Sequence, residues 1–177
     1  CLLTSALILS NGLELSSIFL ALRVSSLTTA LPFLLLFAAQ PLQRFGNTFS
    51  LGQWTQHHGR ELWIIAAVSH FIHLGQIGLY YTLGKYCSLF SWTFTIPMWG
   101  ILLVFSVLAI AKPNLFFQAQ VARFYSLGSW YVWCIFTAAF SLGSAAQHLL
   151  FYNLPAATLF IAAGVLRGLP RQLKTAK

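Results

Sequence analysis

Residues 61–83 read ELWIIAAVSHFIHLGQIGLYYTL, an apolar run that is long enough to cross a bilayer and has two histidines near its middle. A helix of about 20 apolar residues spans the hydrocarbon core of a membrane. Comparable runs occupy residues 2–22, 24–42, 91–111, 124–147 and 154–166. The sequence therefore predicts an all-α integral membrane bundle of about six transmembrane helices, with residues 1–177 forming a single domain.

The composition excludes most soluble activities. The chain is 58% hydrophobic and only 7% charged, whereas soluble domains carry about 25% charged residues. It contains no aspartate, and its two acids are Glu14 and Glu61. Reactions that depend on paired carboxylates, on a Ser-His-Asp triad or on aspartate-bound magnesium lack the necessary groups. The net charge of +8 comes from lysines and arginines spread between apolar runs, a pattern of membrane topology and not of nucleic-acid binding.

The distribution of lysine and arginine predicts an orientation, since short cytoplasmic loops are enriched in both residues. Arg23 and Lys85 fall on one side of the expected bundle. The other basic residues fall on the opposite side: Arg44, Arg60, Lys112, Arg123, Arg167, Arg171, Lys174 and Lys177. We therefore expect both termini on the cytoplasmic side of a membrane, most simply the bacterial cytoplasmic (inner) membrane.

Small residues and cysteines suggest packing roles. Glycines are expected where helices approach closely in a membrane, so Gly75 and Gly78 predict contact between the third and fifth spans. Cys87 and Cys134 lack the C-x-x-C spacing of zinc or redox sites, and we interpret both as packing residues. Cys1 stands where a complete chain would have Met, which favours a fragment over a lipidated N-terminus.

His70 and His73 are the strongest candidates for chemistry. They are three residues apart and so share one face of a helix, with Gln76 one step further along. An ionisable residue at mid-membrane depth is costly and is by default a functional candidate. Three interpretations stay open. The histidines are two neutral imidazoles hydrogen-bonded to neighbouring helices, with Gln76 or Ser69 satisfying one of them; or at least one of the pair ligates haem; or they form a proton or quinone site without metal.

The remaining histidines are weaker candidates. His57 and His58 lie in the polar stretch before the third span, where solvated or interfacial histidines are common. His148 lies near the outer end of the fifth span, and a clamp with His73 would have to bridge well over roughly 10 Å of depth at 1.5 Å per residue. We do not expect that pair to share a ligand.

Three stretches resemble a known family. They are RVSSLTTALPFLLLFAAQPLQRF (residues 23–45), GRELWIIAAVSHFIHL (59–74) and RFYSLGSWYVWCIF (123–136). Their order is similar to that in the ferric-reductase-like transmembrane family, which includes the haem-binding membrane subunit of the bacterial methionine-sulfoxide-reductase system. The resemblance covers roughly residues 23–140.

The resemblance implies a cofactor and its ligands. His73 best matches the third-helix histidine that binds b-type haem in this family, and His70 lies one turn earlier. At the positions of the fifth-helix histidines this sequence has Tyr125 and Ala138, so the resemblance implies at most one haem. The implied function is a one-haem electron-transfer subunit, part of an oxidoreductase system, between quinone and a partner protein.

Two other functions remain open, and the sequence does not decide whether the chain is an enzyme. One alternative is a non-catalytic membrane subunit that has lost haem and serves packing or assembly of a membrane complex. The other is a small transporter or proton pathway around His70, His73 and Gln76. The transporter is less favoured because midplane transport sites are typically built on helices broken by Gly or Pro.

Overall fold

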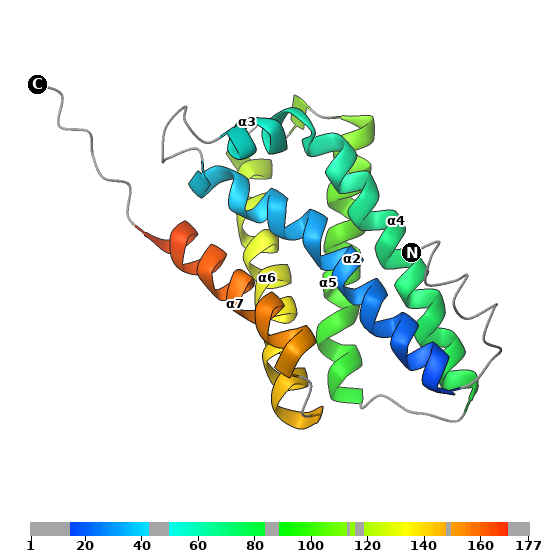
Figure 1. Ribbon diagram of the computed structural model, residues 1–177. Helices are drawn as coiled ribbons and strands as arrows, with labels where there is room; N and C mark the ends of the chain where they lie inside the picture. The colour runs from blue at the N-terminus through cyan, green and yellow to red at the C-terminus, as the bar shows by residue number, and fades with distance from the viewer. Residues whose placement is uncertain are drawn as a thin grey trace, which may run out of the picture.

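The computed structural model describes residues 15–42, 50–83, 89–112, 114–115, 119–147 and 150–169. Every regular element in these ranges is helical, as the sequence predicts. The helices are α2 (Leu15–Leu42), α3 (Ser50–His57), α4 (Gly59–Thr82), α5 (Leu89–Ala111), α6 (Ala119–Gln147) and α7 (Leu150–Gly168) (Figure 1).

Helix α2 differs from the expected pair of spans at residues 2–22 and 24–42. The structure has one continuous helix through Arg23, and residues 2–14 lie outside the described part of the chain. Arginine is a good helix former. The following serines bond back to the preceding turn, Ser25 Oγ to Leu22 O at 3.0 Å and Ser26 Oγ to Arg23 O at 2.7 Å. Arg23 therefore lies within a helix and not in a loop.

The long helices alternate in direction. Helix α4 packs along α2 and α5, α6 packs along α5 and α7, and α7 also contacts α2 (Figure 1). The C-terminal ends of α2, α5 and α7 lie at the same end of the bundle as the N-terminal ends of α4 and α6. The short helix α3 lies across that end and contacts α2 and α4.

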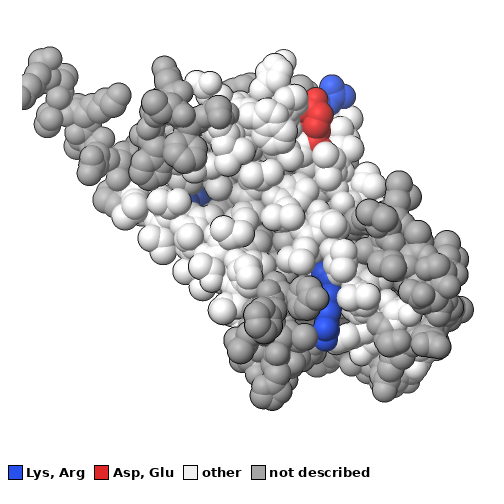
Figure 2. Space-filling view, viewed as in Figure 1, with Lys and Arg blue, Asp and Glu red and all other residues white. Residues whose placement is uncertain are grey.

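Three helices are long and apolar enough to cross a membrane, namely Ser17–Ala39 within α2, Gly59–Thr82 and Trp92–Ala111. Large apolar side chains such as Val68, Phe71 and Val107 are exposed on the outer surface, and few of the described residues on the face seen in Figure 2 are charged. This is the surface of a membrane protein. Helices α6 and α7, expected as the fifth and sixth spans, do not reach the same apolar content.

The core is aromatic, and Phe33 of α2 lies at its centre. Its ring centroid is 6.4 Å from that of Trp63 on α4, 5.6 Å from that of Phe136 on α6 and 6.5 Å from that of Phe160 on α7. These four side chains are buried. Offset and edge-on aromatic pairs stabilise packing beyond the area they bury, so Phe33 joins four helices around one point.

The expected role of Gly75 and Gly78 is wrong. Both are exposed, and a Cβ added at either would meet nothing within 4 Å, so they face away from α6. The close approaches occur at Gly128, where a Cβ would lie 2.6 Å from Phe105, and at Gly164, where it would overlap the ring of Trp133. The glycine spacing in a sequence does not reveal which helix face meets a neighbour.

The expected packing roles of the two cysteines have different outcomes. Cys134 is exposed on α6 and does not pack in the core, because the adjacent positions Val132 and Trp133 occupy the inward face of that turn. Cys87 lies outside the described residues.

Candidate functional site

His70 and His73 lie near the middle of α4. At 1.5 Å per residue, His70 is about 16 Å along the helix axis from Gly59 and has a similar length of helix on its other side. The two imidazole rings project from the same face, as their spacing predicts, with centroids 6.2 Å apart.

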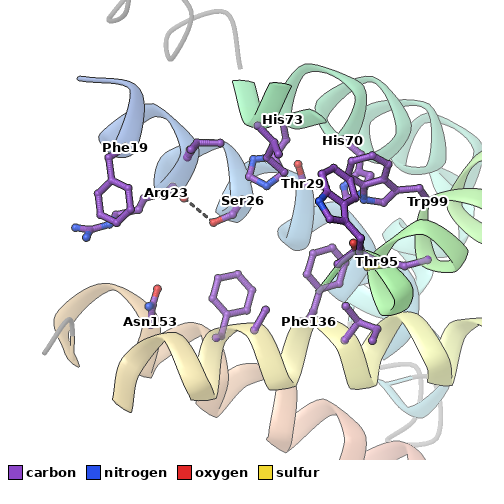
Figure 3. Close-up of a pocket in the computed structure, with 17 residues that line it drawn as sticks. Phe19, Arg23, Ser26, Thr29, His70, His73, Thr95, Trp99, Phe136 and Asn153 are labelled. Carbon is purple, nitrogen blue, oxygen red and sulfur yellow. Dashed lines mark hydrogen bonds between the residues drawn. The ribbon is translucent and has the colours of Figure 1, made fainter. Parts of the chain in front are cut away.

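Both histidines border a cavity of about 320 Å³ between α2, α4, α5, α6 and α7 (Figure 3). This volume is at the lower end of the range for small-molecule and cofactor sites. Figure 3 shows that the two ends of the cavity differ: His70 and Trp99 lie at one end, and Arg23 and Asn153 lie at the other. The lining between them is largely aromatic and aliphatic.

A hydrogen bond from α2 orients the ring of His73. Its Nδ1 lies 2.7 Å from Ser25 Oγ, and Ser25 Oγ donates its proton to Leu22 O. A hydroxyl has one proton to donate, so in the tautomer in which that proton goes to Leu22 O, Ser25 Oγ accepts from Nδ1–H of His73. The lone pair of His73 is then on Nε2. A histidine whose Nδ1–H is held by a neighbour and whose Nε2 is the acceptor has the arrangement of a metal-ligating histidine.

His70 has no hydrogen-bond partner for either ring nitrogen among the described residues, although both atoms are buried. Its ring instead meets the edge-on aromatic rings of Trp99 at 5.3 Å and Phe136 at 6.4 Å. Among the described residues, neither Ser69 nor Gln76 is therefore a hydrogen-bond partner of His70, whereas His73 has a partner on the neighbouring helix α2. Leaving a buried polar group without a hydrogen-bond partner lowers the free energy of unfolding by about 1–3 kcal/mol. A ligand or a bound water at the nitrogens of His70 would remove this cost.

The protein groups around the cavity do not suffice to bind a bare metal ion. No cluster of three or more histidines, cysteines or acids exists among the described residues. Of these residue types, the described part of the cavity lining contains His70 and His73 alone. A group that brings its own equatorial ligands needs only one or two axial protein ligands. Among the described lining residues, His70 and His73 could serve as such ligands.

The residues at the family's fifth-helix ligand positions face away from this cavity. Tyr125 packs against Trp63 and Phe105, with ring centroids 5.9 Å and 5.0 Å apart. Ala138 is exposed on α6. The residues of α6 that line the cavity are instead Ile135, Phe136, Ala139 and Phe140, and none of them is a metal ligand.

The other histidines lie apart from the site. His57 and His58 pack together near the end of α3 with centroids 5.0 Å apart, and His58 lies 4.9 Å from the ring of Trp54. None of these three lines the cavity. His148 lies outside the described residues.

Sequence reasoning missed Ser25, Arg23 and Asn153. A charged residue inside an apolar run is a signal for a site. Arg23 carries this signal, but the sequence analysis placed Arg23 in a loop between two spans and so did not treat it as a residue inside a span. Ser25 and Asn153 had no such signal, because their roles depend on contacts with other helices.

Comparisons of the chain with models of known protein families, with curated proteins and with solved structures found no match.

Proposed function

We propose that this chain is a membrane electron-transfer subunit that binds one b-type haem in the cavity between α2 and α6, with His73 as an axial ligand. The observation that carries the proposal is the Ser25–His73 contact of 2.7 Å, which orients the ring of His73 beside the cavity. Such second contacts orient metal ligands, and their loss typically weakens metal affinity about 10–100-fold.

The other lining residues support this assignment. Trp99 and Phe136 provide flat apolar walls that exclude water and suit a planar ring system. Bound haem would supply a one-electron Fe(III)/Fe(II) couple. The resemblance of residues 23–140 to the ferric-reductase-like family agrees with this cofactor. Electrons would come from a quinol or a partner protein, in a bacterial cytoplasmic membrane with both termini on the cytoplasmic side.

The number of haems per chain follows from the residues of α4 and α6 that line the cavity. His70 and His73 lie on one face of α4, so they would approach a bound haem from the same side. The wall of α6 offers no histidine, cysteine or methionine. We therefore expect at most one haem per chain, which His73 would hold.

The lack of ligand side chains on the described α6 wall also supports a second candidate function. A related membrane subunit that had lost haem would keep the packing of α4 against α2 and would have no ligand on α6. It would serve the packing or assembly of a membrane complex.

Haem titration of the purified chain in detergent separates the two candidates. We expect a Soret band that saturates at one haem per chain by pyridine haemochrome analysis. His73→Ala should abolish it, Ser25→Ala should weaken haem affinity about 10-fold or more, and His57→Ala, a control outside the cavity, should leave it unchanged. Circular dichroism and size-exclusion profiles confirm folding of each variant. Full haem retention in His73→Ala would contradict the ligand assignment, and absence of haem in the wild type would favour the second candidate.

A further inference from the structure

The short helix α3 lies where a membrane-spanning helix begins. It contacts α2 and α4 and crosses one end of the bundle (Figure 1). The chain passes from α3 into α4 with little interruption, because the N–H of His58 bonds to Trp54 O at 2.9 Å and the N–H of Leu62 bonds to His58 O at 3.0 Å. The span of α4 starts at Gly59. Helix α3 is therefore attached directly to the start of this span.

The side chains of α3 have two kinds of surroundings. Gly52 and Thr55 are buried, and Thr55 Oγ1 donates to Leu51 O at 2.7 Å, so its proton is satisfied within the helix. Leu51 and Trp54 are three residues apart and share a face, on which they are 40% and 47% exposed. His57 is exposed beside them. The outward face of α3 therefore combines large apolar side chains with a polar edge.

The level of α3 matches the surface of a bilayer. The ring centroid of Trp54 is 4.9 Å from that of His58, at the start of α4. At the far end of α4, the ring of Tyr81 lies 5.6 Å from that of Trp92, and Trp92 Nε1 donates a hydrogen bond to Tyr81 Oη.

The separation of these two aromatic pairs is that of two membrane interfaces. His58 and Tyr81 are 23 residues apart, which is about 35 Å of helix rise. The hydrocarbon core of a bilayer is about 30 Å thick, and the headgroup layers bring the total to about 40–45 Å. When α4 crosses a bilayer, both aromatic pairs therefore fall in the headgroup layers, where tryptophan and tyrosine are enriched.

The exposed apolar face of α3 is small for a protein partner. Half of a tryptophan surface is on the order of 100 Å², and Leu51 does not bring the total near the roughly 800 Å² per side of a stable protein interface. A lipid surface has no such threshold, because the affinity of an amphipathic helix scales with its buried apolar area. Arg60 and Glu61 follow α3, are both exposed and carry opposite charges, so this contact does not depend on anionic lipid.

We propose that α3 is an interfacial helix whose Leu51–Trp54 face binds the boundary between the headgroups and the acyl chains of the adjacent leaflet. The apolar body of the Trp54 indole faces the acyl chains, and its N–H faces the headgroups. Together with the Tyr81–Trp92 pair in the other leaflet, this contact determines the depth at which α4 crosses the membrane. The inference does not depend on a bound cofactor.

Depth-dependent fluorescence quenching tests the proposal. The full-length chain is placed in phosphatidylcholine nanodiscs whose acyl chains carry bromine either near the headgroup or near the terminal methyl. The chain has six tryptophans, so the signal of Trp54 is the difference between wild type and Trp54→Phe. Bromine near the headgroup should quench this signal about twofold or more strongly than bromine near the methyl end, because the interface lies about 15 Å from the bilayer centre. Iodide in the water should quench it weakly.

Two further variants support the measurement. Trp63→Phe is the matched control, because Trp63 is 4% exposed and its difference signal should not depend on the position of the bromine. Leu51→Trp adds a tryptophan to the proposed lipid-binding face, and the added signal should show the same stronger quenching near the headgroup. This variant keeps the test decisive should Trp54→Phe fail to fold, which size-exclusion profiles reveal.

Three results would overturn the proposal. Strong quenching by iodide without quenching by bromine would place the Leu51–Trp54 face in water. Quenching by neither agent would mean that protein covers this face, either a second copy of the chain or another partner. Stronger quenching by bromine near the methyl end would place α3 inside the hydrocarbon core.

Discussion

Arg167 of α7 donates a hydrogen bond from Nη1 to the carbonyl oxygen of Phe37 on α2, at 3.2 Å. In an unbroken helix that carbonyl would accept from the N–H of residue 41, but residue 41 is proline and has none. The guanidinium also lies 4.3 Å from the Phe37 ring centroid. A distant side chain therefore replaces a missing helical hydrogen bond and joins the ends of α2 and α7.

We predict that Arg167→Leu destabilises the protein by about 1.5–3 kcal/mol, the range for buried hydrogen bonds to charged groups. The loss should shrink in a Pro41→Ala background, because an alanine in place of the proline would supply the missing N–H to Phe37. Chemical denaturation in detergent, followed by tryptophan fluorescence, measures all four proteins of this double-mutant cycle. Strict additivity of the two substitutions would show that Arg167 does not compensate for Pro41.

Replacing the two site histidines should have different effects on the stability of the ligand-free protein. His70→Leu removes two buried nitrogens that lack partners, so it should leave the free energy of unfolding unchanged or raise it by about 1 kcal/mol. His73→Leu removes the contact with Ser25 and should lower it by about 1 kcal/mol. Both are measured by the same denaturation experiment. A loss in His70→Leu as large as that in His73→Leu would mean that His70 is satisfied in the free protein.

Gly164→Ala should destabilise the contact between α6 and α7. The added Cβ would overlap the ring of Trp133, whose Nε1 donates to Phe160 O at 2.6 Å. Overpacking of this kind typically costs about 1–3 kcal/mol. Gly75→Ala is the control, since a Cβ there meets nothing within 4 Å. Thermal unfolding should show a lower midpoint for Gly164→Ala alone, and equal midpoints would contradict the close approach.

The orientation prediction is tested with a reporter enzyme that is active only outside the cytoplasm. Fused after Lys177 it should give no activity, because the basic residues Arg60, Lys112 and Arg123 lie at the end of the bundle that we expect to be cytoplasmic. Fused after Leu83, at the opposite end of α4, it should be active. Strong activity at Lys177 would reverse the orientation.

The sequence by itself determined the class of the protein and the placement of its most distinctive residues. Hydropathy and helical periodicity are local properties, so the apolar span at residues 61–83 coincides closely with α4, Gly59–Thr82. The same local rule places His70 and His73 on one face at mid-helix. The boundary expected at Arg23 was wrong because a single charge does not end a helix.

Only the tertiary structure decided what surrounds those histidines. Ser25 and His73 are 48 residues apart in sequence, and Phe37 and Arg167 are 130 apart. Such pairs meet because whole helices pack with particular faces together, and hydropathy is nearly uniform around helices that face both lipid and protein. Which face packs inward depends on the shapes of the side chains. At Phe33 aromatic rings from different helices pack together, and at Gly164 the absence of a side chain leaves room for the ring of Trp133. That fit, and not local propensity, leaves His70 without a partner among the described residues and opens the cavity beside it.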